Sequence, residues 1–254
     1  MHKPLFILVI SVILSHFNVE VISAQEIGLQ LYSLRNEFPK DVPGTFAKIK
    51  AWGIHNLEDG NDGTYGYTQE EYNALLAEND LKIVSVSAPF EELQNSPETV
   101  LARAKNYGAK YVVCFWIPHN GNDFTIGDTS LALEVFNTAG KVLQDGGITL
   151  TYHPHGYEFR PYKGEFLIDH LIKNSEYFDF EMDVYWFAHP GEDPVEWLRK
   201  YPKEFKLMHL KDFIEHYDLH KKEAAAIGET TSLHEFLCTH YIHPDDHEHE
   251  SGKS

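Results

Sequence analysis

The chain alternates short apolar segments typical of β-strands with segments that have the apolar spacing of α-helices. Seven strand-like segments follow one another with a helix-like segment between neighbours: 27–34, 55–60, 82–88, 110–116, 148–154, 178–186 and 205–212. This alternation is typical of parallel strands joined by right-handed helical connections. It predicts an α/β protein, and eight such units would close a barrel.

The eighth unit is the weak part of the pattern. After Asp212 the chain becomes polar, and HYIH at 240–243 offers only a degenerate strand. A length of 254 residues suits one barrel domain. We therefore predict a TIM (β/α)8-type barrel over 25–230, with the eighth βα unit missing or degenerate, and an atypical tail rich in histidine and acidic residues at 231–254.

The first 24 residues have the pattern of a secretory signal peptide. A short basic start, MHKP, precedes the ten-residue run LFILVISVIL, and small residues lead to Ala24. Because a bilayer span needs about 20 apolar residues, a retained anchor is the weaker alternative. We expect cleavage after Ala24, a mature form with no stable membrane span, and a periplasmic or secreted location.

The charge of the chain limits its binding partners, and its two cysteines are not expected to form a disulfide. The chain has 21 basic and 39 acidic residues, for a formal net charge of -18, which argues against nucleic acid as a partner. An acidic surface is also ordinary in soluble enzymes. Cys114 lies in an apolar run and is expected to be a buried thiol rather than to pair with Cys238.

Polar side chains end several of the predicted strands. Alternation along a strand groups them, together with Leu207, on the face that we expect to point into the barrel: Thr149, Thr151 and His153; Glu181, Asp183 and Tyr185; Leu207, His209 and Lys211. Three strands would then deliver oxygen and nitrogen ligands to one place.

Six features together give the chain a specific resemblance to a known family, although each alone is weak. They are GLQLYSLR at 28–35, the glutamate that closes the second strand, AKYVVC at 109–114, YHPHGYEF at 152–159, MDVYW at 182–186 and HLKD at 209–212. From Ile27 to Asp212 the chain resembles the sugar phosphate isomerase/epimerase family with the xylose isomerase-like TIM barrel, especially its secreted bacterial branch.

The resemblance implies a divalent cation held by Glu158, Asp183 and His209. Carboxylates with an imidazole suit manganese, zinc, cobalt or iron, and the absence of thiolates argues against a closed structural zinc site. Such a cation, with a nearby base, would support proton abstraction next to a carbonyl.

Other residues at the predicted barrel mouth have two interpretations. His153, His155 and Glu158 are candidates for catalysis, although barrel histidines are as often only hydrogen-bonded. Lys211 would either polarise a carbonyl or form an ion pair with Asp183. Glu58 is a candidate for substrate binding, with a surface ion pair as the alternative.

Aromatic residues near these positions suggest a surface for a sugar ring. Trp186 is a candidate for substrate binding and could share this role with Phe115 and Trp116, although aromatics at strand ends are as often core.

The chain departs from the family pattern at several positions. Ser87, Ala88 and Pro89 stand where a histidine is usual, and Pro154 and Gly156 replace asparagine and aspartate. The glutamate that the family's eighth strand supplies as a fourth ligand has no match, and Glu229, His243 and Asp245 cannot be assigned to it.

We therefore expect a secreted, metal-dependent sugar isomerase/epimerase or keto-glycoside lyase. Its substrate would be a small sugar or an oxidised glycoside, without phosphate because the protein is exported. The alternative is a non-catalytic or inactivated sugar-binding barrel, and a truncated copy that never folds stably is a third hypothesis. A homo-oligomer is one way to cover an open barrel edge.

Overall fold

A seven-stranded parallel sheet forms the centre of the molecule. The computed structural model describes residues 26–59, 63–121 and 123–211. The strands lie in the order β1 (Gly28–Gln30), β2 (Asn56–Glu58), β3 (Lys82–Ser87), β4 (Tyr111–Cys114), β5 (Thr149–Tyr152), β8 (Phe178–Asp183) and β9 (Phe205–His209). Every neighbouring pair is parallel. The predicted α/β barrel-type fold with seven strands is confirmed.

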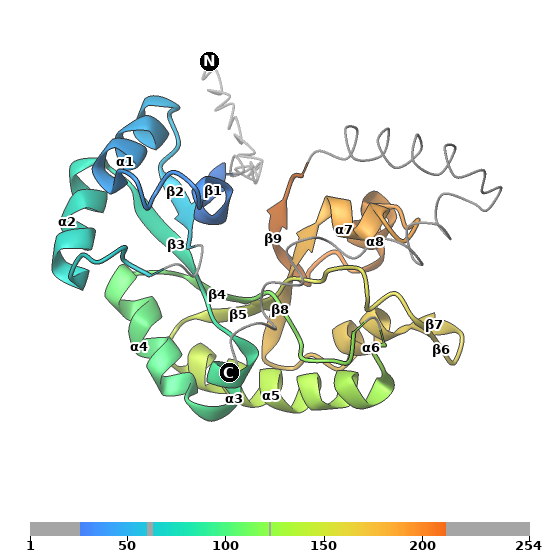
Figure 1. Cartoon of the computed structure of the whole chain (residues 1–254). Coiled ribbons are helices and arrows are strands. Elements are labelled where there is room, and N and C mark those ends of the chain that lie inside the picture. Colours follow the sequence, from blue (N-terminus) through green and yellow to red (C-terminus); the bar gives the residue numbers. More distant parts are fainter. Residues whose placement is uncertain (1–25, 60–62, 122, 212–254) are drawn as a thin grey trace, which may run out of the picture.

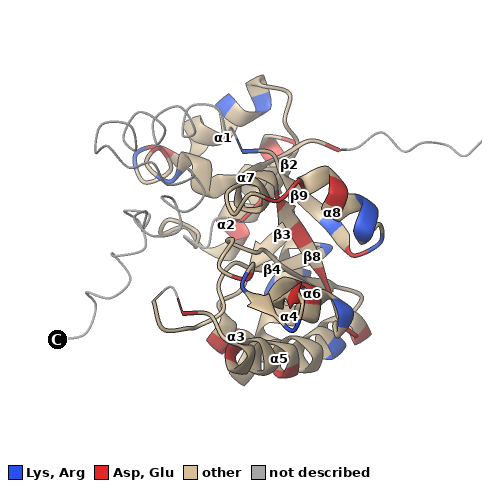
Figure 2. Ribbon diagram, turned by 90° about the vertical axis from the view of Figure 1, so that its right-hand side faces the viewer, with Lys and Arg blue, Asp and Glu red and all other residues tan. Residues whose placement is uncertain are grey.

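Helices form an outer layer around the curved sheet (Figure 1). They are α1 (Val42–Ala51), α2 (Gln69–Glu78), α3 (Phe90–Asn95), α4 (Pro97–Tyr107), α5 (Ile126–Asp145), α6 (Leu167–Lys173), α7 (Val184–Ala188) and α8 (Pro194–Lys200). Thr68 and Thr125 begin α2 and α5 with capping boxes to Glu71 and Asp128, because each side chain satisfies a backbone N–H that the first turn leaves open. Acidic and basic residues both lie on α5 and α8 (Figure 2).

The hydrophobic core lies between the sheet and this outer layer. Phe136 of α5 contacts Tyr152 of β5 and Phe178 of β8, with ring centroids 5.3 and 5.2 Å apart. Cys114 is buried here, as predicted, and burial raises the pKa of its thiol to about 12, while Cys238 lies outside the described residues. These contacts bury the outward-facing side chains of the strands against the helices, whereas polar side chains lie on the inward faces.

Two local predictions were wrong, and one element was not predicted. The first strand ends at Gln30, and Leu31–Leu34 form a 3-10 helix. Tyr185 and Trp186 belong to α7 rather than to a strand, because the Asp183 side chain caps that helix by accepting from both backbone N–H groups. A hairpin of β6 (Pro161–Tyr162) and β7 (Glu165–Phe166) was not predicted.

The sheet is not closed within the described residues, where β1 and β9 are the two ends of the strand order and do not pair. The predicted signal peptide, eighth unit and tail lie outside those residues. Across the described part of the chain, no helix is both long and apolar enough to cross a membrane.

Candidate metal centre

The carboxyl ends of β5, β8 and β9 bring three polar residues together. Asp183 and His209 are partners in the β8–β9 register, so their side chains lie next to each other. His153 directly follows β5, where its backbone N–H donates to the carbonyl of Cys114. Parallel strands place their carboxyl ends at one edge of the sheet, which explains why residues distant in sequence meet here.

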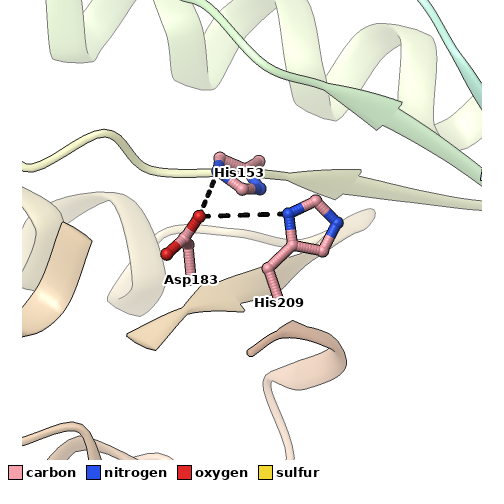
Figure 3. A group of neighbouring side chains, drawn as sticks. All are labelled: His153, Asp183 and His209. Carbon is pink, nitrogen blue, oxygen red and sulfur yellow. Dashed lines mark ion pairs between the residues drawn. The ribbon is translucent and has the colours of Figure 1, made fainter. Parts of the chain in front are cut away.

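His153, Asp183 and His209 form the first candidate group (Figure 3). Asp183 Oδ2 lies 3.4 Å from His153 Nε2 and 3.9 Å from His209 Nδ1. The side chains of His153 and Asp183 are 1% and 0% exposed, and that of His209 is 13% exposed. Two imidazoles and one carboxylate thus lie close together in a part of the site that is mostly shielded from solvent.

Two further carboxylates hold the outer nitrogens of these histidines. Glu181 Oε2 lies 2.9 Å from His153 Nδ1, and Glu58 Oε1 lies 2.8 Å from His209 Nε2. A charged carboxylate accepts a hydrogen bond from the nitrogen it faces and leaves the other ring nitrogen with its lone pair. This arrangement directs His153 Nε2 and His209 Nδ1 as acceptors toward Asp183.

The same carboxylates also make a second candidate group, Glu58, Glu181 and His209. Burial would raise the pKa of Glu58, but its contacts with His209 hold that pKa below its usual value. Burial raises the pKa of Glu181 well above its usual value, and the neighbouring charge of Glu58 adds to this. A cation nearby would favour the ionised form of Glu181.

The residues fit a divalent metal ion. His153 Nε2 is buried and has no hydrogen-bond partner among the described residues, and it lies 3.4 Å from Asp183 Oδ2. Buried polar atoms normally have partners, so this nitrogen marks a place for a ligand. Two imidazoles with one carboxylate suit manganese, zinc, cobalt or iron.

Lys211 reaches the same carboxylate from the end of β9. Its Nζ lies 2.6 Å from Asp183 Oδ2, which is the ion pair considered from the sequence. Burial would raise the pKa of Asp183, but His153 and Lys211 outweigh burial and hold that pKa well below its usual range. Asp183 is therefore a carboxylate at any ordinary pH.

Glu158 lies outside both candidate groups. It is fully buried, its Oε1 accepts from Tyr152 Oη and from the backbone N–H of His155, and its Oε2 has no partner among the described residues. Burial raises the pKa of Glu158 to about 7, against the lowering effect of the Tyr152 hydrogen bond. A carboxyl with this pKa suits proton transfer.

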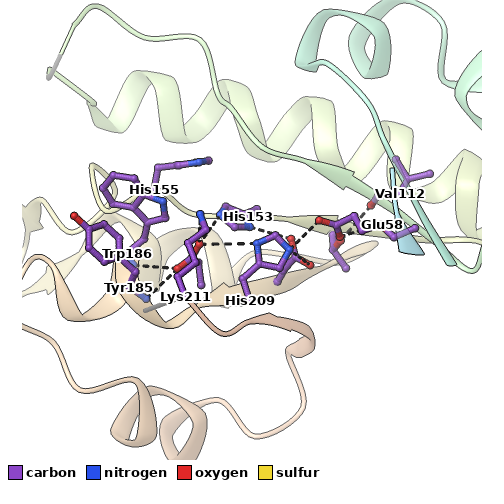
Figure 4. Close-up of polar contacts among 12 residues, drawn as sticks. Glu58, Val112, His153, His155, Tyr185, Trp186, His209 and Lys211 are labelled. Carbon is purple, nitrogen blue, oxygen red and sulfur yellow. Dashed lines mark hydrogen bonds and ion pairs between the residues drawn. The ribbon is translucent and has the colours of Figure 1, made fainter. Parts of the chain in front are cut away.

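His155 and Trp186 lie on the opposite side of His153 from Glu58 (Figure 4). The His155 ring lies 4.7 Å from that of His153 and 5.4 Å from that of Trp186. Burial lowers the pKa of His155 well below its usual value, and the charge of His153 contributes.

Sequence reasoning placed Glu181 on the inward polar face, because it lies two residues before Asp183 and so shares its strand face, but gave it no individual role at the site. It gave no role to His119 or Tyr157. His119 and Tyr157 lie in loops, where no period fixes direction. Their positions come only from packing.

Two surface hollows lie away from this centre. One, of about 500 Å³, is lined by residues at the amino ends of β5, β8 and β9, including Thr149, Asp179 and Lys206. The other, of about 550 Å³, lies beside the β6–β7 hairpin and α8. Neither contains a residue of the two metal-ligand groups.

A comparison with known proteins supports the coarse family resemblance. No family model matches the chain. An inosose dehydratase of Clostridium beijerinckii (strain ATCC 51743 / NCIMB 8052) is 26% identical over 200 residues, which make up 73% of this chain and 59% of that protein. The chain thus spans less than two thirds of the length of that relative.

Solved structures show the same fold. A sugar phosphate isomerase/epimerase from Parabacteroides distasonis ATCC 8503 matches with a TM-score of 0.66 and 25% identity, covering 82% of this chain and 87% of that one. A xylose isomerase-like TIM barrel protein from Mycobacterium smegmatis in complex with magnesium matches with a TM-score of 0.58 and 13% identity, covering 85% and 93%. The chain is similar to xylose isomerase-like TIM barrels and sugar phosphate isomerase/epimerases.

Proposed function

We propose that this protein is a secreted, metal-dependent sugar isomerase/epimerase or keto-glycoside lyase that acts through proton abstraction next to a carbonyl. The observation that carries the proposal is the convergence of two imidazoles and one carboxylate, His153, Asp183 and His209, at one buried point where His153 Nε2 has no hydrogen-bond partner among the described residues. The similarity to an inosose dehydratase and to a sugar phosphate isomerase/epimerase supports the reaction class.

His153, Asp183 and His209 would hold the cation, and Glu58 and Glu181 would orient the two imidazoles. A bound divalent cation would polarise a sugar carbonyl and so acidify the neighbouring C–H. Glu158 Oε2 would accept that proton and return it, since its pKa of about 7 permits both steps near neutral pH. His155 would help to position the reacting oxygen, and Lys211 would keep Asp183 ionised.

The second candidate function is a sugar-binding barrel without catalysis. One observation favours it: Lys211 Nζ already lies 2.6 Å from Asp183 Oδ2, so an ammonium group neutralises the carboxylate that a cation would need. A lysine can replace a metal as a counter-charge but cannot supply open coordination positions for a sugar.

Metal content and proton exchange separate the two functions. Inductively coupled plasma mass spectrometry of the purified protein should find about one metal per chain, lost in Asp183→Ala and kept in Asp179→Asn, a matched acidic residue at the other end of β8. The metal should also remain when residues 231–254 are removed. NMR in D₂O should show exchange of a carbon-bound proton in a sugar substrate.

Two results would contradict the enzyme proposal and favour the binding barrel. One is a protein that contains no metal, and the other is metal that is lost only when residues 231–254 are removed. The secreted location is tested separately, because it rests on residues 1–24. Expression of the full chain in a bacterium should give a periplasmic product whose mass corresponds to cleavage after Ala24. An uncleaved cytoplasmic product would contradict it.

A further inference from the structure

A short series of hydrogen bonds leads from the loop after β4 to the carboxyl group of Glu158. The backbone N–H of Ile117 donates to Tyr157 Oη, with 3.1 Å between the nitrogen and the oxygen. Tyr157 Oη lies 2.8 Å from Tyr152 Oη, and Tyr152 Oη donates to Glu158 Oε1. We call these four residues the tyrosine chain. It connects the loop after β4 with the end of β5 and the loop that follows it.

The direction of each bond in the tyrosine chain follows from the number of protons. A phenol has one proton to donate, and an ionised carboxylate only accepts. Because Tyr152 gives its proton to Glu158, the bond between the two hydroxyl groups uses the proton of Tyr157. Tyr157 keeps that proton for Tyr152, because its other neighbour is a backbone N–H, which cannot accept. Every bond of the chain therefore points toward Glu158.

The chain is shielded from water along most of its length. Ile117, Tyr152 and Glu158 are fully buried, and Tyr157 is partly buried. The ring of Tyr152 also packs against that of Phe136 on α5, and close packing leaves a ring few other orientations. A hydrogen bond in such surroundings is stronger than in water, and successive bonds strengthen one another. The tyrosine chain is therefore a rigid support for the carboxyl group at its end.

This support makes the two oxygens of the Glu158 carboxyl different. Oε1 accepts from Tyr152 Oη and from the backbone N–H of His155, which lies 3.2 Å away. Oε2 is buried and has no partner among the described residues. Two donors on one oxygen oppose rotation of the carboxyl group, so the lone pairs of Oε2 keep one direction. Buried polar atoms normally have partners, and Oε2 is thus the oxygen that is left for a ligand.

Packing alone does not require the two hydroxyl groups. Phenylalanine at positions 152 and 157 would bring the same rings without burying further polar atoms, which are costly unless each one is paired. A network that served only stability would also satisfy all of its members. The tyrosine chain instead ends at a carboxyl group with one open oxygen. This favours a role for the chain at the site rather than in the core.

We propose that Tyr152 and Tyr157 are positioning residues, which hold Oε1 of Glu158 so that Oε2 faces the reacting C–H of the substrate. This inference rests on the proposed function, in which Glu158 moves the proton. No proton passes along the chain, because the proton taken from carbon stays on Oε2 until it returns to the substrate. Ile117 anchors the chain, so the loop after β4 helps to set the direction of the base.

NMR of the full chain labelled with carbon-13 at the tyrosine Cζ tests the hydrogen bonds without a substrate. The Cζ shift reports the hydrogen bonding of the phenol oxygen, and single Tyr→Phe variants assign the signals. Tyr157→Phe should shift the signal of Tyr152, which loses its donor, and Glu158→Gln should shift the signals of both tyrosines. Tyr162→Phe, in β6, is the matched control and should move neither signal.

Proton exchange tests the positioning role. The probe is methyl 3-keto-β-glucoside in D₂O, and NMR measures exchange of the proton beside its carbonyl. At saturating probe, exchange should be about tenfold slower in Tyr157→Phe, with KM within twofold of the native value, because the base loses its fixed direction and the sugar keeps its contacts. Tyr162→Phe should exchange at the native rate. Near-ultraviolet circular dichroism verifies that each variant is folded.

Three results would overturn the inference. A Tyr152 signal that does not move in Tyr157→Phe would show that the chain does not form. Native exchange in Tyr157→Phe, or a loss that lies only in KM, would show that the chain does not position the base. If the native protein exchanged no proton while the signals shifted as expected, the proposed function would fail together with the positioning role, but the hydrogen bonds of the chain would stand.

Discussion

The two histidines of the centre depend on carboxylates that would not touch the cation. Glu181 lies 2.9 Å from His153 Nδ1 and is 1% exposed, so once a bound cation has ionised Glu181 its charge would act at short range and with little screening. Carboxylate partners of this kind fix the imidazole orientation and raise its basicity. Glu58, whose Oε1 lies 2.8 Å from His209 Nε2, fixes the orientation of the His209 ring in the same way.

The first prediction concerns Glu181→Gln, which removes the charge and keeps the size. Metal affinity should fall about 10- to 100-fold, because His153 loses its charged partner. Competition with a fluorescent chelator measures the change. Glu176→Gln, an exposed site before β8, is the control and should leave affinity unchanged. Unchanged affinity in Glu181→Gln would contradict the orienting role.

The second prediction uses the raised pKa of Glu158. Burial raises this pKa from 4.5 to about 7, so between these values the folded protein keeps a proton that the unfolded chain has released. The stabilising contribution is therefore fully present below about pH 4.5 and is lost as the pH rises to about 7, by about 3 kcal/mol.

Urea unfolding of the native protein and Glu158→Gln across this window tests the effect. As the pH rises, the unfolding free energy of the native protein should fall relative to that of Glu158→Gln. Glu134→Gln, an exposed site on α5, should show no such trend. A difference that is constant with pH would show that Glu158 titrates normally.

At the residue scale, what the sequence predicts well is the set of side chains on regular strands. Asp183 and His209 are placed by alternation along β8 and β9, and the structure pairs them in register. Glu158 is implied only by resemblance and lies past the end of β5, where Gly156 turns with a φ of 94°. A two-residue period has no meaning across such a turn.

At the scale of elements, α5 packs unusually close to the segment before β8. A Cβ atom added at Gly140 would lie 2.1 Å from the carbonyl oxygen of Tyr177, which is backbone and cannot move easily. The third prediction is that Gly140→Ala destabilises the protein by about 1–3 kcal/mol, despite the better helix propensity of alanine.

Denaturant unfolding of Gly127→Ala gives the matched comparison on the same helix. Its added Cβ would meet only Thr125 Oγ1, at 3.4 Å, which is ordinary contact. Its stability should stay within about 1 kcal/mol of the native value. If both variants were equally stable, the close approach of α5 to Tyr177 would not exist in solution.

Helix ends explain why some elements were predicted and others were not. Pro97 begins α4, and Gly108 follows it with a φ of 66°, so both boundaries were visible in sequence. The apolar and aromatic residues after Asp183 favoured a longer strand, yet the side chain of Asp183 starts α7 instead. A functional carboxylate thus also decides where its strand ends.

For the whole molecule, the sheet edge that the described residues leave open at β9 has an energetic consequence. In the described part of the chain, Met208 of β9 is 40% exposed, and Leu210, just after β9, is 81% exposed. The backbone groups at a strand edge and neighbouring apolar side chains favour association. The formal net charge of -18 opposes it through repulsion that salt screens.

The fourth prediction follows from this balance: the protein should self-associate through β9, and more strongly as salt rises. Size-exclusion chromatography with light scattering should give a molar mass above that of the 29.2 kDa chain at high salt. Met208→Lys combined with Leu210→Lys should restore the monomer, because lysine at an edge disfavours pairing. Val195→Lys, on α8 and 49% exposed, is the control and should not.

A monomer at every salt concentration would contradict this prediction and imply that the β9 edge is covered within one chain. The sequence could suggest the open edge, since no convincing eighth strand follows Asp212, but could not say what covers it. Strand pairing is a long-range choice, whereas composition and alternation are local signals. The oligomeric state therefore decides whether the site is completed by one chain or by two.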